Sequence, residues 1–149
     1  MERGKDYIGV GVGAAIINPD RKVLMAQRGI EAKNERFRWE LPGGAVEMWE
    51  TSKRAVIREI TEELGIKIEV ISMIGFWDHI ILDEGQHWVS STHLCRVVSG
   101  EPKILEPHKC AAIGWFTLDE ASELLLTGIC QNSINKLIRL YPKGLPNLY

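Results

Sequence analysis

The feature that most constrains this chain is a glycine-rich loop that runs into a strongly acidic helix. Residues 51–64 carry helix signals, because Thr51 or Ser52 can cap the start and Gly65 stands where a glycine commonly ends a helix. The upstream Leu41-Pro42-Gly43-Gly44 segment is expected to break any regular element. The chain is therefore predicted to build its fold around a loop–helix unit.

Three glutamates of this helix fall on one face. Glu59, Glu62 and Glu63 are spaced i, i+3 and i, i+4, which places their Cβ atoms about 5–6 Å apart. Carboxylates this close repel one another unless a cation lies between them. Hard divalent cations such as Mg²⁺ prefer carboxylate oxygens and keep further positions for water and phosphate. Taken alone, the three glutamates also fit a solvated acidic helix face.

The residues around the glutamates suggest how a site there could be held. Arg58 can reach Glu62 one turn on, or Glu50 at the start of the helix, and so could orient a carboxylate. Gly43 and Gly44 lack side chains, which lets backbone carbonyls and amides approach a metal or a phosphate closely.

The segment also follows a longer spacing pattern, G-x5-E-x7-R-E-U-x-E-E-x-G-U, in which U is aliphatic. Every specified position is filled, by Gly44, Glu50, Arg58, Glu59, Ile60, Glu62, Glu63, Gly65 and Ile66. This pattern is the Nudix box, and the chain resembles the Nudix hydrolase superfamily. The order of the predicted strands and helices is similar to that family over most of the chain.

The resemblance implies hydrolysis of a nucleoside diphosphate linked to another group X, with water attacking phosphorus and Mg²⁺ or Mn²⁺ required. It implies that Glu59, Glu62 and Glu63, with the carbonyl of Gly43, hold the metal. Arg58 becomes both a catalytic-site residue and the partner that orients Glu50.

One position departs from the common family pattern. Trp49 stands where many members have glycine, so it is expected to reshape the turn or to cover the metal site. Position 49 lies in the variable part of the box, so the box itself is intact. Glu47 matches a glutamate that is frequent in the family.

The rest of the chain predicts an α/β fold. Strands are expected at residues 8–17, 23–27, 66–75, 87–98 and 112–117, and further helices at 119–126 and 131–140. The turn signal Asn18-Pro19-Asp20 joins the first two strands into a hairpin. With no repeat or linker, residues 1–149 are predicted to be a single Nudix hydrolase domain. The family fold is an α/β/α sandwich with a mixed sheet, in which the box forms the loop–helix–loop.

Substrate choice depends on residues outside the box. Arg28 ends the second strand, where an arginine of nucleoside-triphosphate enzymes meets substrate; it could also be a surface residue. Glu106 is the first residue of the segment Glu-Pro-His-Lys-Cys, which is similar to one in the family's nucleoside-triphosphate diphosphatases. That similarity makes it a candidate catalytic carboxylate, with an exposed loop residue as the alternative.

Aromatic side chains could stack on a base. Trp77 is expected to leave a strand at the mouth of a base pocket, which makes it the preferred candidate for substrate binding. Trp88 is a further candidate, whereas packing is the favoured explanation for Trp39 and Trp115.

The leading hypothesis is a Mg²⁺-dependent pyrophosphohydrolase that converts a nucleoside triphosphate to the monophosphate and pyrophosphate. Many ADP-ribose enzymes of the family carry a proline after the box, and this chain has none between Gly65 and Pro102. A nucleoside-diphosphate-sugar or ADP-ribose hydrolase is the alternative. A non-catalytic nucleotide-sensing module is disfavoured because no box glutamate is missing.

Composition limits the partners. Eighteen basic and twenty acidic residues leave a formal charge of −2, which gives no bulk attraction to nucleic acid or anionic lipid. No apolar run is long enough to cross a membrane, and the polar start does not resemble a secretory signal. Three widely spaced cysteines form neither a metal motif nor a disulfide framework. A cytoplasmic enzyme of a small nucleotide is expected, and the family resemblance makes a homodimer plausible.

Overall fold

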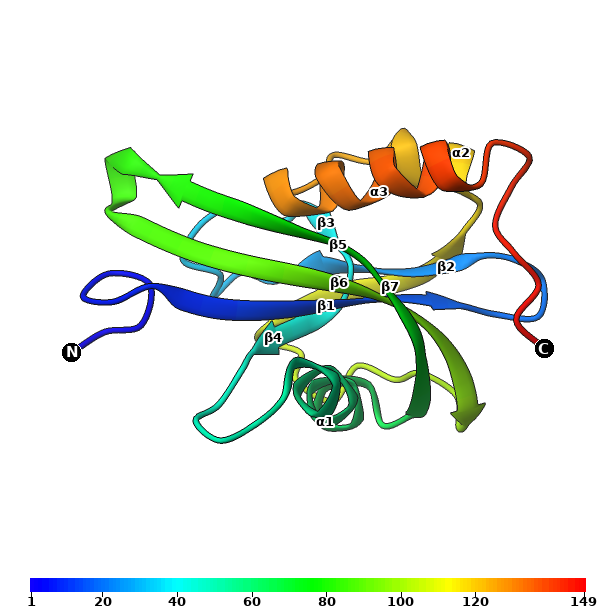
Figure 1. Cartoon of the computed structure of the whole chain (residues 1–149), viewed down its shortest axis with the longest axis horizontal. Coiled ribbons are helices and arrows are strands. Elements are labelled where there is room, and N and C mark those ends of the chain that lie inside the picture. The colour runs from blue at the N-terminus through cyan, green and yellow to red at the C-terminus, as the bar shows by residue number, and fades with distance from the viewer.

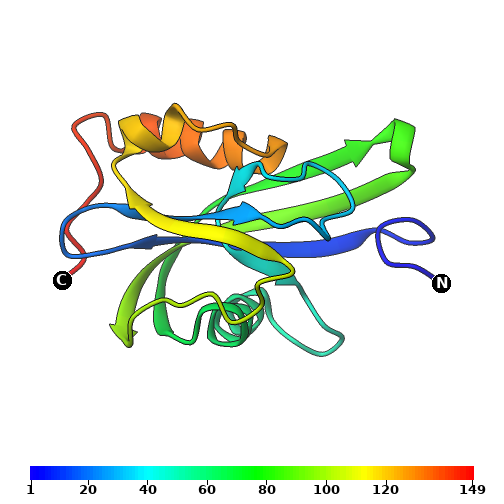
Figure 2. The ribbon, with the colours of Figure 1, turned by 180° about the vertical axis from the view of Figure 1, so that it is seen from behind.

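In the computed structural model, which describes residues 1–149, a mixed β-sheet lies between two layers of helix (Figures 1 and 2). Helix α1 (Ser52–Leu64) covers one face, and α2 (Leu118–Ser122) and α3 (Gly128–Leu140) cover the other. No helix is both long and apolar enough to span a membrane. The predicted α/β sandwich with a mixed sheet is confirmed.

The sheet is organised around β1. Its strands are β1 (Gly9–Ile17), β2 (Val23–Arg28), β3 (Trp39–Glu40), β4 (Gly43–Ala45), β5 (Lys67–Ile81), β6 (Gln86–Ser99) and β7 (Cys110–Phe116). On one side β1 runs parallel to β6. On the other side it pairs antiparallel with β4 near its start and with β2 at its end. The order continues from β2 to β3, β7 also pairs with β2, and β5 follows β6. The sheet therefore forks beside β1, between β2 and β4.

Alternation along β1 supplies both halves of the core, as expected for a strand buried on both faces. Ala15 and Ile17 join the apolar cluster under α2 and α3. Val12, Ala14 and Ile16 join a second cluster under α1. The sheet thus fixes α1 and α3 on opposite faces.

Helix α1 confirms the predicted helix within one residue at its start. The side chain of Thr51 accepts a hydrogen bond from the backbone of Arg54, and Gly65 ends the helix with φ of 68°. Ala55, Ile60 and other apolar residues bury one side against the sheet. Glu62 lies on the exposed side of the helix, whereas Glu59 and Glu63 are half-buried.

Several predicted boundaries are wrong. The segment around Gly43 does not break all regular structure, because Gly43–Ala45 pairs with β1 as β4. The helix expected at 119–126 ends at Ser122. The carbonyl of Leu125 instead accepts the amide of Trp39, and the carbonyl of Trp39 accepts the amide of Thr127. Thr127 then caps α3, which begins earlier than predicted.

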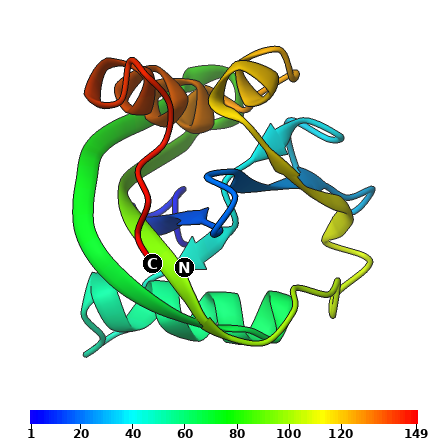
Figure 3. The ribbon, with the colours of Figure 1, turned by 90° about the vertical axis from the view of Figure 1, so that its right-hand side faces the viewer.

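The strands predicted at 66–75 and 87–98 are longer than expected. They form one hairpin, β5 and β6, joined through a short 3-10 turn, η1 (Leu82–Glu84). Figure 3 shows this hairpin curling from the α3 side of the molecule to the α1 side. The polar residues at 78–79 suggest a loop, but the structure places them inside β5, where exposed and partly buried side chains alternate.

Candidate active site

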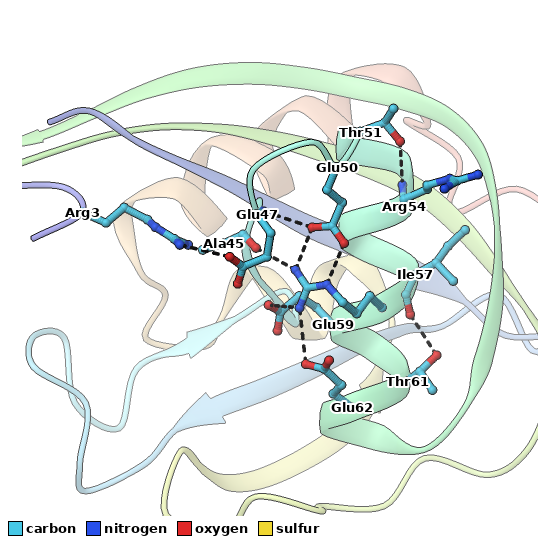
Figure 4. A network of polar contacts seen from close by, with 11 residues as sticks. Arg3, Ala45, Glu47, Glu50, Thr51, Arg54, Ile57, Glu59, Thr61 and Glu62 are labelled. Atoms are coloured by element: carbon cyan, nitrogen blue, oxygen red, sulfur yellow. Dashed lines mark hydrogen bonds and ion pairs between the residues drawn. The ribbon is translucent and has the colours of Figure 1, made fainter.

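One guanidinium group ties the loop to the helix of the acidic segment (Figure 4). Arg58 donates to both carboxylate oxygens of Glu50, at 2.7 and 2.8 Å. It also donates to the carbonyl of Ala45 at 3.0 Å, and to Glu59 and Glu62 at 2.9 and 3.3 Å. A bidentate pair of this kind is strong and directional. Arg58 thereby sets the position of the loop relative to α1.

The same contacts govern protonation at the start of the helix. Hydrogen bonds from Arg58, with a further one from the backbone amide of Glu47, lower the pKa of Glu50 to about 2. The Glu50 carboxylate raises the already high pKa of Arg58. Both groups therefore stay charged across the neutral range.

Gly44 has a direct role in seating a glutamate. A Cβ atom at this position would lie 2.2–2.5 Å from the carboxyl atoms of Glu59, which real atoms cannot do. The side chain of Glu59 is only 14% exposed. The bare backbone of β4 therefore forms the cradle in which the Glu59 carboxylate lies.

Glu63 lies among other acids. Burial, followed by the charges of Glu59, Glu40 and Glu106, raises the pKa of Glu63 to about 8. The nearby cation Lys109 is paired with Glu106 at 3.0 Å. Glu59 and Glu40 are likewise paired, with Arg58 and Arg28, so Glu63 is the one acid of this cluster that has no ion pair.

The side chains do not form a ready-made metal site. No three acidic, histidine or cysteine side chains converge on one point. Glu59 and Glu62 both point toward Arg58 instead. The donor set nevertheless fits a hard divalent cation, since carboxylates crowd around Glu63 and a carbonyl-bearing glycine loop lies beside them.

Glu63 opens into a cavity of about 230 Å³, whereas Glu59 and Glu62 lie outside its lining. Its lining includes Glu63 from α1, Gly43 from β4 and Glu106 from the loop before β7. Glu106 comes here because the amide of Leu105 donates to the carbonyl of Glu63 at 3.1 Å. The structure thus brings together the predicted residues Glu63, Gly43 and Glu106.

Arg28 also reaches this cavity, at the end of β2. Its guanidinium is already engaged by the Glu40 carboxylate at 3.1 Å and by the backbone and side-chain oxygens of Asn34. Sequence reasoning missed Glu40, whose only signal is its place just before the Leu-Pro-Gly-Gly segment. Burial raises the pKa of Glu40, and the charge of Arg28 partly opposes that shift.

A second cavity, of about 380 Å³, lies on the α3 side of the sheet. Its lining shares three residues with the first cavity: Arg28, Glu40 and Gly43. Most of the other lining residues come from strands β1, β4, β5 and β6, from the loop before β3 and from the start of α3. The two cavities therefore meet at the fork of the sheet.

The predicted position of Trp77 is wrong. It lies inside β5, opposite Ser90, and its ring packs against the apolar core under α3. It lines neither cavity, whereas the other aromatic candidate, Trp88, lines the second one. The pairing of β5 with β6 turns the Trp77 side chain inward, and a single strand gives no signal of that.

Trp49 does not cover the acidic cluster, as the sequence had suggested it could. Its side chain is 98% exposed. Its backbone adopts φ of 68°, the left-handed conformation that a glycine would take more easily. Glu47, beside this turn, forms an ion pair with Arg3 at 3.3 Å. The turn therefore keeps a glycine-like shape in spite of the tryptophan.

Comparison with known proteins points to one family. The sequence profile of the NUDIX domain matches residues 8–135. A MutT-like protein of Streptomyces ambofaciens is 30% identical over 114 residues, which cover 76% of this chain and 67% of that protein. An ADP-ribose pyrophosphatase of Methanocaldococcus jannaschii is 39% identical over 90 residues, covering 59% of this chain and 51% of that protein.

The matched region is shorter than most of these proteins. Across four curated relatives, it spans between 32% and 67% of their length. Among solved structures, a MutT NUDIX hydrolase from Burkholderia pseudomallei superposes with a TM-score of 0.81 at 39% identity. That superposition covers 89% of this chain and 99% of the other.

Proposed function

The chain belongs to the Nudix hydrolase family, and we propose that it is a Mg²⁺-dependent pyrophosphohydrolase of nucleoside triphosphates. The products would be a nucleoside monophosphate and pyrophosphate. Residues 1–149 would act as one domain in the cytoplasm, with no nucleic-acid or membrane partner, and a homodimer is compatible with the family.

The observation that carries the proposal is the junction of the two cavities. Glu63 of α1 and Glu106 line one cavity, and the larger cavity on the α3 side joins it at Arg28, Glu40 and Gly43. A substrate with an anionic end and a bulky organic end matches this arrangement. Its phosphates would lie at the fork of the sheet and its nucleoside in the larger cavity.

Glu59, Glu62 and Glu63, with the carbonyl of Gly43, are the residues that would hold a divalent cation. Such a cation neutralises charge that develops on the phosphates and lowers the pKa of an attacking water. Family members generally use a divalent metal, and the carboxylate donors here favour Mg²⁺ or Mn²⁺.

The protein's own groups would orient the reactants. Arg58 holds Glu59 and Glu62 in fixed directions through the contacts at 2.9 and 3.3 Å. Glu106 would accept the proton of the water, and its position in the lining of the same cavity as Glu63 supports this role. Lys109 holds the Glu106 carboxylate by an ion pair at 3.0 Å. Arg28 would bind phosphate by exchanging part of its contact with Glu40.

A second candidate function is hydrolysis of ADP-ribose or of a nucleoside-diphosphate sugar. It is favoured by the relative named ADP-ribose pyrophosphatase. The same acids would act, and only the group in the larger cavity would differ. A non-catalytic nucleotide-sensing module is the third possibility, and the complete set of box glutamates argues against it.

A panel assay tests the proposal. The purified protein with Mg²⁺ is offered canonical and oxidised nucleoside triphosphates, ADP-ribose, nucleotide sugars and dinucleoside polyphosphates, and the products are separated by chromatography. Monophosphate plus pyrophosphate is the expected result. Sugar phosphate with inert triphosphates would instead establish the second function. Binding without turnover under any cation would establish the sensing module.

A further inference from the structure

Three glycines alternate along β1 on the face toward α3. They are Gly9, Gly11 and Gly13, and their partners on β6 are Trp88, Ser90 and Thr92. Successive side chains of a strand point to opposite faces, so residues 9, 11 and 13 share one face with Ala15 and Ile17 of the core under α3. Gly11 and Gly13 line the larger cavity. Part of its floor is therefore bare backbone.

Close packing explains why Gly9 has no side chain, and it leaves little room for one at Gly11. A Cβ atom at Gly9 would lie 2.4 Å from the ring of Trp88. A Cβ atom at Gly11 would lie 2.7 Å from the hydroxyl of Ser90. At both positions a larger residue would force a neighbour to move.

Packing does not require a glycine at position 13. A Cβ atom there would meet only Leu41 and Thr92, each at 3.9 Å, which is ordinary van der Waals contact. The φ angle of Gly13 is not in the left-handed region. Glycine inside a strand is less favourable than alanine, because it loses more conformational freedom on folding. The fold would therefore accept alanine at position 13 and gain from it.

The position of Gly13 relative to the two cavities suggests what could occupy the volume that its missing side chain leaves open. Its partner across the ladder is Gly43, which lines both cavities. Adjacent strands lie about 4.8 Å apart, so Gly13 is one strand spacing from the junction where the phosphates would lie. Ile129 and Cys130, at the start of α3, line the same cavity.

We propose that Gly13 is a specificity-determining residue, whose missing side chain leaves room for the nucleoside part of the substrate, beginning at its sugar. The inference rests on the proposed function, because it assumes a nucleoside phosphate in these cavities. The nucleoside lies on the backbone of β1, and a methyl group at position 13 occupies part of its volume.

The test compares Gly13→Ala and Gly13→Val with the wild type. Calorimetry measures the affinity for the nucleoside monophosphate released from the best substrate, and separately for inorganic pyrophosphate. Gly13→Ala is expected to melt at the same or a higher temperature. It should bind the monophosphate at least about tenfold more weakly, since one added carbon in a fitted pocket changes recognition by about 10–200-fold. Gly13→Val should weaken it further, and pyrophosphate affinity should not change.

Gly128→Ala is the matched control. Nothing lies within 4 Å of a Cβ atom at that position, and Gly128 lines neither large cavity. This variant should bind both ligands as the wild type does.

Three results would overturn the inference. One is unchanged monophosphate affinity in Gly13→Ala; another is an equal loss of monophosphate and pyrophosphate affinity. The third is a clear fall in the melting temperature of Gly13→Ala, which would make the glycine structural. Wild-type protein that neither binds nor hydrolyses any nucleotide would overturn the proposed function as well, so the two failures are distinguishable.

Discussion

At the scale of single residues, Arg58 and Glu63 occupy opposite electrostatic environments on one helix. Arg58 is surrounded by three carboxylates that stabilise its charge. Glu63 is buried among acids that oppose its ionisation. The first arrangement supports the fold, whereas the second is unfavourable in the metal-free protein and would become favourable with the divalent cation proposed above. Residue substitutions should therefore separate stability from activity.

Glu63→Gln is expected to lower turnover by about 10²-fold or more, because charge stabilisation through a metal is a large part of catalysis. The metal-free variant should be as stable as the wild type or more stable, since the substitution removes a buried, repelled carboxyl. Steady-state kinetics and thermal melting in EDTA measure the two effects. Near wild-type turnover would remove Glu63 from the site.

Glu50→Gln tests the pair with Arg58 through pH. The pKa of Glu50 is lowered to about 2 in the folded protein, against about 4.3 in an unfolded chain. Its contribution to stability is therefore fully present above the unfolded pKa and is lost as pH falls from about 4.5 toward 2. Wild type should melt above the variant at pH 7, and the gap should narrow at pH 3. A gap that does not change with pH would contradict this account.

Trp49→Gly is expected to stabilise the fold by up to about 1.6 kcal/mol. Relief of the left-handed backbone is worth about 1–2 kcal/mol, and the greater freedom of glycine in the unfolded chain costs about 0.4–1 kcal/mol. Little packing is lost, because the side chain is 98% exposed. Chemical denaturation measures the change. Met48→Gly, also exposed but without a positive φ, is the control and should not stabilise.

At the scale of elements, the C-terminal end of α1 binds the loop that carries Glu106 and so holds it near Glu63. Helix ends leave backbone carbonyls without partners. The carbonyls of Glu63 and Leu64 accept the amides of Leu105 and Lys103, so the segment after β6 runs along this end. Glu106 follows directly, and β7 then pairs with β2 beside Arg28. The contacts at the end of α1 and the β2–β7 pairing thus bring Glu106 to the candidate site.

The C-terminal segment contacts the end of the β1–β6 ladder at which Ile17 pairs with Arg96. The hydroxyl of Tyr149 accepts the amide of Val97 at 2.8 Å and donates to the carbonyl of Ile17 at 2.5 Å. Tyr149→Phe should lower the free energy of unfolding by about 1–2 kcal/mol, since two hydrogen bonds are lost. Urea denaturation measures the loss. Tyr141→Phe is the control, and an equal effect in both variants would contradict a specific role of the Tyr149 hydroxyl.

At the scale of the whole molecule, a net charge of only −2 hides a strongly acidic cavity. Four acids, Glu31, Glu40, Glu63 and Glu106, line that cavity, against only two cations, Arg28 and Lys109. The molecule is therefore expected to respond to divalent cations through one place rather than through its surface as a whole.

Mg²⁺ at tenfold excess over its Kd is expected to stabilise the wild type by about 1.4 kcal/mol, and EDTA should reverse the effect. Thermal melting across a Mg²⁺ series measures it. Glu63→Gln should reduce the response. Glu69→Gln should keep it, because Glu69 pairs with Arg96 and lies outside both cavities. An equal response in both variants would place the cation elsewhere.

The sequence by itself determined the helix 51–64, its two ends, and the spacing that puts Glu59, Glu62 and Glu63 on one part of it. These are local properties, since caps and helical periodicity depend on residues within a few positions of each other. It also identified Arg28 and Glu106 as candidates, without showing that they share a cavity.

Only the tertiary structure decided how these parts meet. The Glu40–Arg28 pair, the nearness of Glu106 to Glu63 and the inward position of Trp77 all arise from contacts between separate elements of the fold. The space above Gly13 exists only because β1, β4 and α3 come together around it. Strand pairing joins residues far apart in the chain, and no short sequence pattern encodes which strands will be neighbours.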